Sequence, residues 1–311
     1  MGKKSRTKGT TTAAAPGEVG PRQPCPCGSG RRYKACHGAT GGPAPVFVRR
    51  PFEGLQGECD IVALRELVPA ASAPVSVKGT DREVVLCSLL PMAAPALVRD
   101  SGAIWVGLQV QHGFGDPSRD LAAVIEKALE AANGEMVGLT GPPGEGPRLQ
   151  DLLEDEPLVV TVHEGFDFWV ADVDEPGSSA SAALDQASAS MTPTRRLASV
   201  EAAYWVDVGS KEHLRWVLPY DEDPLLDALA RLHASGQDDL VDGSRFVGMF
   251  RAHGLLTPVW DLAVGTGADV LEEAVARVGK ALEAALAEAT PLSAAERAAR
   301  SGLANRQVTL R

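Results

Sequence analysis

Features of several well-known protein classes are absent from this chain of 311 residues. No apolar run reaches the ~18 residues of a membrane-spanning helix. The N-terminus, MGKKSRTKGTTTAAAPGEVG, lacks the apolar middle of a secretory signal. The G-x-S-x-G, H-E-x-x-H and P-loop patterns of common enzyme classes are missing as well. We therefore expect a cytoplasmic protein without membrane insertion. Whether it is an enzyme stays open, and the lack of a catalytic signature favours a non-enzyme.

Cysteine is scarce, with five residues, but three of the five lie close together. Residues 24–38 read PCPCGSGRRYKACHG, in which Cys25, Cys27 and Cys36 are followed directly by His37. Thiolates and an imidazole are ligands that bind zinc tetrahedrally, and the GSG triplet lets the chain reverse so that both ends reach one ion. In a cytoplasmic chain such a cluster indicates a metal site rather than a disulfide framework. Oxidation of the first two cysteines, or a metal-free turn, is the alternative.

This stretch resembles the SEC-C motif, the zinc-binding tail of the bacterial preprotein translocase motor SecA. That motif reads CPCGSG, a basic helical turn with Tyr, then Cys, Cys or His, and Gly. The resemblance implies one structural zinc ion whose four positions are all filled by protein, which leaves none for a catalytic water. The implied ligands are Cys25, Cys27, Cys36 and His37, and the matching scaffold residues are Gly28, Ser29, Gly30, Tyr33, Lys34 and Gly38.

Charge is distributed unevenly along the chain. Residues 1–50 hold ten Lys and Arg and one acid, a balance of +9, whereas residues 51–311 have a balance of −20, which gives −11 in total. A basic arm on an acidic body indicates that nucleic acid is bound only through the arm. We predict that Arg31, Arg32 and Lys34 bind the partner, because zinc would hold these side chains rigidly. The alternative is that the basic residues only keep the arm soluble.

Composition also divides the chain into segments. Residues 1–23 are rich in Gly, Thr, Ala and Pro and are predicted to be disordered. The zinc knuckle at residues 24–38 is followed by a Pro- and Gly-rich linker at residues 39–53. The body then consists of a first half, residues 54–175, and a second half, residues 195–311. The knuckle is therefore expected to be tethered to the body rather than built into it.

The body is predicted to have an α+β fold, with antiparallel sheets, helices on one face, and two similar ββα-type halves. Asp116 and Pro117 are typical of the start of a helix, and Gly134 of its end. Glu164-Gly165 predicts a hairpin between two strands. The expected strands lie at 74–79, 84–90, 103–110, 157–163, 166–173, 200–208, 213–220 and 257–264, with 245–252 as strand or helix. The expected helices lie at 59–68, 117–133, 178–190, from 223, at 267–289 and from 292.

All five tryptophans fall in these predicted strands. Because the body is acidic, we expect them to pack in the core rather than to stack on nucleic-acid bases. They are Trp105, Trp169, Trp205, Trp216 and Trp260.

Candidate chemistry in the body is weak. The loop GTGAD at residues 265–269 could present amides to a phosphate, but helix capping is the better interpretation. His112 in HGFGDP could be a general base, although no partner is fixed beside it by spacing. The other body histidines stand alone, and Cys87 in an apolar strand reads as a small buried hydrophobe.

The leading hypothesis is therefore a bacterial adaptor. By the SEC-C resemblance, its basic knuckle would dock the ribosome or a secretion-type chaperone, and the body would have a second role. The alternative is an enzyme with an active site between the two halves, localised by the knuckle. A structural or oligomerisation protein is the third option. The body resembles a bacterial family of unknown function, which adds no mechanism.

Overall fold

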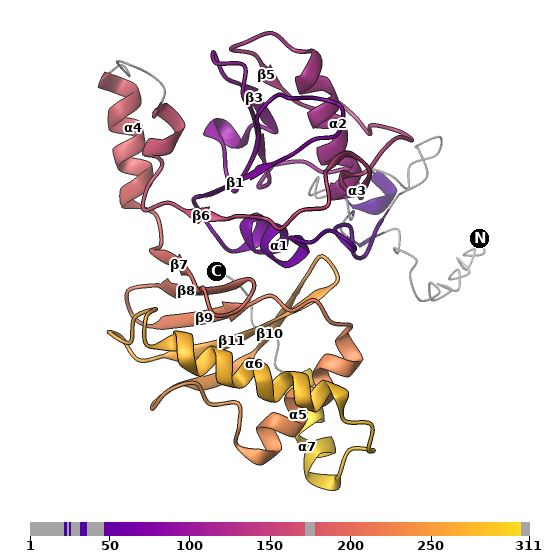
Figure 1. Ribbon diagram of the computed structural model, residues 1–311, viewed down its shortest axis with the longest axis vertical. Helices are drawn as coiled ribbons and strands as arrows, with labels where there is room; N and C mark the ends of the chain where they lie inside the picture. The colour runs from indigo at the N-terminus through magenta and orange to yellow at the C-terminus, as the bar shows by residue number, and fades with distance from the viewer. Residues whose placement is uncertain (1–21, 24, 26–31, 36–46, 172–177, 306–311) are drawn as a thin grey trace, which may run out of the picture.

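The computed structural model describes residues 22, 23, 25, 32–35, 47–171 and 178–305. The predicted disordered arm therefore lies outside the described residues except for Arg22 and Gln23. Two sheets and their helices form the body (Figure 1). None of the helices in the described ranges combines the length and apolarity that a bilayer crossing requires.

The first sheet has six strands and is mixed. Its order is β5-β3-β4-β2-β1-β6, in which β2 and β4 are parallel and the other pairs antiparallel. The strands are β1 (Ala71–Val75), β2 (Val84–Cys87), β3 (Ala96–Val98), β4 (Ile104–Gly107), β5 (Met136–Val137) and β6 (Thr161–Val162).

The second sheet has five strands, all antiparallel, in the order β10-β11-β9-β8-β7. Strands β10 and β11 are joined by the two-residue turn His253-Gly254, in which both residues have positive φ, as a type I′ hairpin requires. The strands are β7 (Thr194–Arg196), β8 (Ala203–Asp207), β9 (Glu212–Trp216), β10 (Arg245–Ala252) and β11 (Leu255–Leu262).

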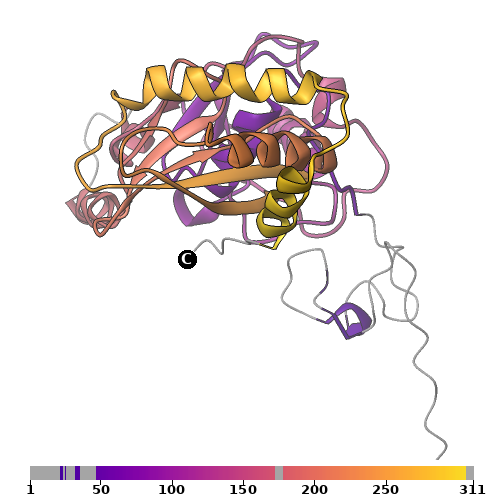
Figure 2. The same cartoon turned by 90° about the horizontal axis from the view of Figure 1, so that it is seen from below.

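Helices separate and cover the sheets. Helix α1 lies between the two sheets, and α5, α6 and α7 cover the far face of the second sheet (Figures 1 and 2). The α-helices are α1 (Glu58–Glu66), α2 (Pro117–Glu130), α3 (Leu149–Leu152), α4 (Ser178–Ala189), α5 (Glu222–Ser235), α6 (Leu271–Ala287) and α7 (Ala294–Ala304). The 3-10 helices are η1 (Tyr33–Ala35), η2 (Pro91–Ala93) and η3 (Asp167–Val170).

Helix α1 joins the two predicted halves. Every residue from Glu58 to Leu64 is buried, including two carboxylates. Asp60 accepts hydrogen bonds from Arg196 (2.9 and 3.0 Å) and from the Tyr204 hydroxyl (2.6 Å), both in the second sheet. One hydrophobic core contains side chains of α1, α2 and both sheets. The division of the body into two halves therefore stays a prediction.

The predicted α+β class is confirmed, and α2 begins at the predicted residue, Pro117, although it ends at Glu130 rather than next to Gly134. The Asp116 side chain accepts from the amides of Ser118 and Arg119, so it caps α2 as expected. The hairpin predicted at Glu164-Gly165 is wrong: β6 pairs with β1, and η3 occupies residues 167–170. Trp169 consequently lies in η3, whereas the other four tryptophans lie in strands. The ambiguous segment 245–252 is the strand β10.

Candidate functional site

Two backbone hydrogen bonds connect the described residues in and beside the knuckle. The Tyr33 amide donates to the Gln23 carbonyl (2.8 Å), and the Ala35 amide donates to the Arg32 carbonyl (2.8 Å), which forms η1. The first bond joins Gln23, which precedes Cys25, to Tyr33, which precedes the predicted ligands Cys36 and His37. Figure 2 shows η1 apart from the body. Hydrogen bonds of this kind form a framework on which ligands from two short segments can meet.

The predicted ligands are partly within the described residues. Cys25 is described and only 5% exposed, whereas Cys27, Cys36 and His37 lie outside the described residues. Within the described ranges, no three His, Cys, Asp or Glu side chains gather so that they could hold a metal ion. The burial of Cys25, together with a donor set of three thiolates and one imidazole, fits zinc.

The predicted partner-binding residues belong to the knuckle. Arg32 and Lys34 are exposed, and Tyr33 between them is half-buried. Arg31 lies outside the described residues. The two described cations are therefore accessible to a polyanion or an acidic protein surface.

The chain enters the body through a firmly held segment. The Val48 amide donates to the Gly115 carbonyl (2.9 Å), and Arg50 forms a two-point ion pair with Glu58 (2.7 and 2.8 Å). Phe52 is fully buried. The last residues of the predicted linker thus pack on the body.

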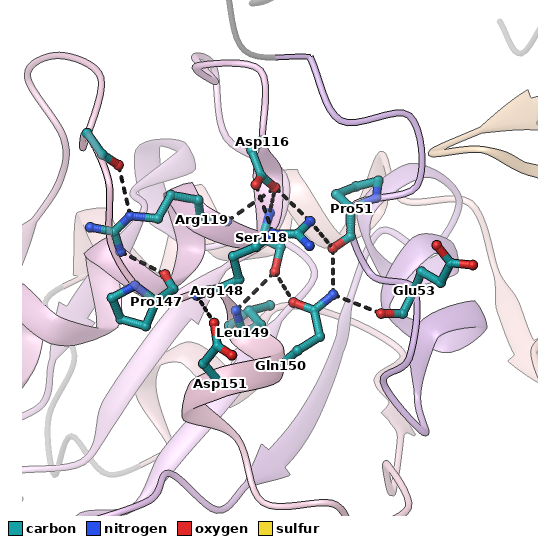
Figure 3. A network of polar contacts seen from close by, with 11 residues as sticks. Pro51, Glu53, Asp116, Ser118, Arg119, Pro147, Arg148, Leu149, Gln150 and Asp151 are labelled. Carbon is teal, nitrogen blue, oxygen red and sulfur yellow. Dashed lines mark hydrogen bonds and ion pairs between the residues drawn. The ribbon is translucent and has the colours of Figure 1, made fainter.

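Figure 3 shows how this segment is held at the start of α2. The Pro51 carbonyl accepts from Arg148 and from Gln150, at 2.8 Å each. Arg148 also forms a two-point ion pair with Asp116 (2.9 and 3.1 Å), and the Ser118 hydroxyl donates to the Gln150 side chain (2.6 Å). The helix cap, the β5–α3 connection and the entering chain therefore form one network.

A cleft of about 610 Å³ lies between the two sheets, beside the entering chain. The charged side chains that line the cleft pair with one another: Arg251 contacts Glu222 (2.5 Å), and His253 contacts Glu66 (2.8 Å). The hairpin turn packs against the entering segment, because a Cβ on Gly254 would lie 2.8 Å from the Arg49 carbonyl. The cleft is lined by residues of both halves, where the alternative hypothesis put an active site, and its charged side chains are largely paired with one another.

A smaller cavity of about 220 Å³ adjoins this cleft and shares four lining residues with it. It lies where the chain leaves the parallel strands β2 and β4, and α2 forms one wall. Gly107, the last residue of β4, is required there, since a Cβ would lie 2.4 Å from the Ala94 carbonyl. The shared residues are Arg65, Val110, Gln111 and Pro117.

The candidates singled out in the sequence have the following environments. The GTGAD loop already holds an anion, because the Gly265 and Gly267 amides donate to the Glu212 carboxylate (2.5 and 2.8 Å). His112 is exposed at the smaller cavity. Cys87 is buried, and burial raises the pKa of its thiol to about 12. The amides of the GTGAD loop are therefore already bound to a carboxylate of the protein itself.

Sequence reasoning missed Arg65 and Asp120, which line the smaller cavity. Burial lowers the pKa of the Arg65 guanidinium and raises the pKa of the Asp120 carboxyl. The available signal was an arginine within the apolar run CDIVALRELV, a place where a charge needs a specific partner.

The arm and the body of the chain match different groups of known proteins. Residues 22–39 match the SEC-C motif. A stretch of 37 residues, 12% of this chain, is 54% identical to protein translocase subunit SecA of Anaeromyxobacter sp. (strain Fw109-5) and covers 4% of that protein. A stretch of 26 residues, 8% of this chain, is 58% identical to SecA of Rubrobacter xylanophilus and covers 3% of it. The chain thus spans only a few per cent of the length of these curated relatives.

The body gives a different result. No solved structure matches the chain. Residues 51–311 match the family of unknown function DUF5926. Because that match extends over the whole described body, the chain belongs to the family of unknown function DUF5926 and carries a SEC-C motif on its N-terminal arm.

Proposed function

We propose that this chain is a zinc-dependent docking protein of the cytoplasm, whose knuckle binds the ribosome or a secretion-type chaperone. The observation that carries the proposal is the SEC-C match at residues 22–39, a stretch that contains the four predicted ligands, Cys25, Cys27, Cys36 and His37. The identity with the translocase subunit SecA over the same stretch supports it. The knuckle would hold one structural zinc ion, which orders the basic side chains around it.

Charge and tethering support a docking role. Lys34 and Arg32 are exposed, and they belong to an arm whose balance is +9 against −20 for the remainder. The chain enters the body at Val48 and Pro51 through hydrogen bonds to Gly115 and Arg148, so the arm is attached to the body at a fixed point. Contacts to phosphate predict binding that weakens steeply with salt.

Co-sedimentation with ribosomes tests the proposal. The intact protein should sediment with ribosomes at low salt and be released by a zinc chelator or by removal of residues 1–45. Arg32→Ala with Lys34→Ala should weaken sedimentation while zinc content stays unchanged. The matched control is Lys127→Ala with Lys280→Ala, two exposed cations of the body.

The second possible partner, a secretion-type chaperone, is tested with the same variants in a pull-down with the purified chaperone. If neither ribosomes nor chaperone are retained at low salt, the docking role is wrong. Retention that survives loss of residues 1–45 would assign docking to the body instead.

A further inference from the structure

We propose that the smaller cavity is a binding site for a small carboxylic acid with an apolar body, whose carboxylate is held by Arg65. This proposal is independent of the docking role of the knuckle. It rests on four features of the cavity: its position in the sheet, its lining, the bonding of its one arginine, and the conformation of its rim.

The cavity lies where ligands commonly bind in sheets with parallel strands. Strands β2 and β4 are the only parallel neighbours among the described strands, and the segments that follow their carboxyl ends form the cavity wall. The chain leaves β2 toward η2 and leaves β4 toward α2, so the two exits diverge around a crevice. Crevices at the carboxyl ends of parallel strands are the preferred ligand sites of such sheets.

The lining is mainly apolar. Leu121 and Val124 of α2 line the cavity, as do Pro95 and Leu139. Met92 and Met136 also belong to the lining and are 77% and 46% exposed. Exposed methionines around a concave apolar surface are typical of binding sites, because their flexible side chains adapt to a ligand.

One buried cation lies at the junction of this cavity with the larger cleft. The Arg65 side chain is only 14% exposed. Its Nη1 donates to the Leu108 carbonyl (2.6 Å), and its Nε lies 3.7 Å from a Glu66 oxygen. No described residue accepts a hydrogen bond from Nη2, although Arg65 lines both cavities. A ligand carboxylate can therefore take up a donor that the protein leaves available.

The neighbouring acids limit the charge of the ligand. Asp120 also lines the cavity and accepts from the Phe114 amide (2.7 Å), and Glu66 lies beside Arg65. These two carboxylates would repel a phosphate or dicarboxylate more strongly than a monoanion, so the site favours a ligand with a single negative charge. An apolar body then occupies the space beside α2.

The rim has a backbone conformation that the local sequence does not favour. Met92 and Ala93 both have positive φ (57° and 52°) in the turn closed by the Ala94 amide and the Pro91 carbonyl (3.1 Å). Turns of this kind favour Asn and Gly. Non-glycine residues in this region are strained, and such residues cluster at ligand clamps. Here the turn places Met92 at the cavity.

Binding of hexanoate to the full-length protein tests the proposal, with isothermal titration calorimetry and thermal unfolding as the measurements. Hexanoate should bind saturably and raise the melting temperature, and it should bind more tightly than butyrate. Hexylamine and hexanol, which have the same apolar chain, should bind at least tenfold more weakly. Equal binding of hexanol, or no saturable binding of hexanoate, would overturn the proposal.

Two variants locate the site. Arg65→Gln should reduce hexanoate affinity at least tenfold. Because Arg65 also supports the Leu108 carbonyl, a second variant that leaves that contact in place, Met136→Glu, adds a negative charge at an exposed lining position and should reduce affinity severalfold. Lys280→Glu, an exposed position on α6 away from the cavity, is the control and should bind hexanoate as the unmodified protein does. Unchanged affinity in Met136→Glu would contradict the assignment even if Arg65→Gln does not fold.

Discussion

The arm and the body of this protein obtain their order by different means. The body buries large apolar side chains in two main cores and satisfies its buried charges with partners far away in sequence. The knuckle at residues 24–38 has almost no apolar side chains, and its expected stabilisation comes from a metal ion. The first kind of order is spread over many contacts, whereas the second depends on four side chains. We therefore expect that the zinc site can be lost while the body stays folded, and that the body can be destabilised while the zinc stays bound.

The largest expected effect is the loss of zinc from the arm. Elemental analysis should show about one zinc ion per chain, as a closed four-ligand site implies. Cys27→Ser should abolish it, because structural zinc supplies on the order of 10–16 kcal/mol to such a site. Thermal unfolding of the body should not change. Cys87→Ser, a buried thiol of the first sheet, is the control that should keep the zinc and destabilise the body. Equal zinc in Cys27→Ser and the unmodified protein would contradict a metal-held knuckle.

The reverse experiment removes order from the body alone. Asp60→Ala leaves the half-buried Arg196 guanidinium and the buried Tyr204 hydroxyl without their common acceptor, and should lower the free energy of unfolding by about 3 kcal/mol. Urea unfolding followed by tryptophan fluorescence measures the change. Asp242→Ala, an exposed position, should have little effect. A parallel loss of zinc at low urea would show that the arm and the body are coupled.

The same contrast explains how much could be predicted from the sequence. The zinc motif and the Asp116 cap are encoded by residues close together in the chain, so their patterns are visible without a structure. The ion pair between Asp60 and Arg196 joins residues 136 positions apart, and no local pattern indicates it.

The wrong hairpin at Glu164-Gly165 has a similar cause. Its apolar residues suggest a strand, yet Phe168 stacks on His163 (4.1 Å between ring centroids), and Trp169 donates to the Leu89 carbonyl (3.1 Å). These contacts are with other parts of the fold, and they favour η3 over a strand. The cavity at Arg65 was missed for the same reason, since the parallel pairing of β2 and β4 is a long-range feature.

A third, smaller effect concerns the stability of the body at acid pH. Burial of Glu212 would raise its pKa, but hydrogen bonds from Gly267, the Trp205 indole (2.7 Å) and Gly265 outweigh burial and hold the pKa below its ordinary value of 4.5. A lowered folded-state pKa stabilises the fold above the unfolded-state value, and this stabilisation is lost as the pH falls through the folded-state value. Stability should therefore decrease as the pH falls from about 4.5 downward.

Glu212→Gln tests this nest directly. The amide has one acceptor oxygen in place of two, so the free energy of unfolding at pH 7 should fall by about 2–3 kcal/mol. The decrease in stability below pH 4.5 should also become shallower. Urea unfolding at pH 7 and pH 4 measures both changes, with the exposed Glu273→Gln as the control. An acid dependence as steep as that of the unmodified protein would assign the acid sensitivity to other carboxylates.

The smallest effect is a gain of stability at the rim of the cavity. Ala93 has φ of 52°, a conformation that glycine adopts without strain, so Ala93→Gly should raise the free energy of unfolding by about 1 kcal/mol. Its neighbour Ala94 has φ of −62°, where glycine only adds freedom to the unfolded chain, so Ala94→Gly should lower stability by about 0.5–1 kcal/mol. Urea unfolding of the two variants compares the signs. Opposite signs would show that stability in the body depends on backbone conformation at single residues, in contrast to the metal-dependent arm, whereas a loss in both variants would show that the turn at Met92 is unstrained.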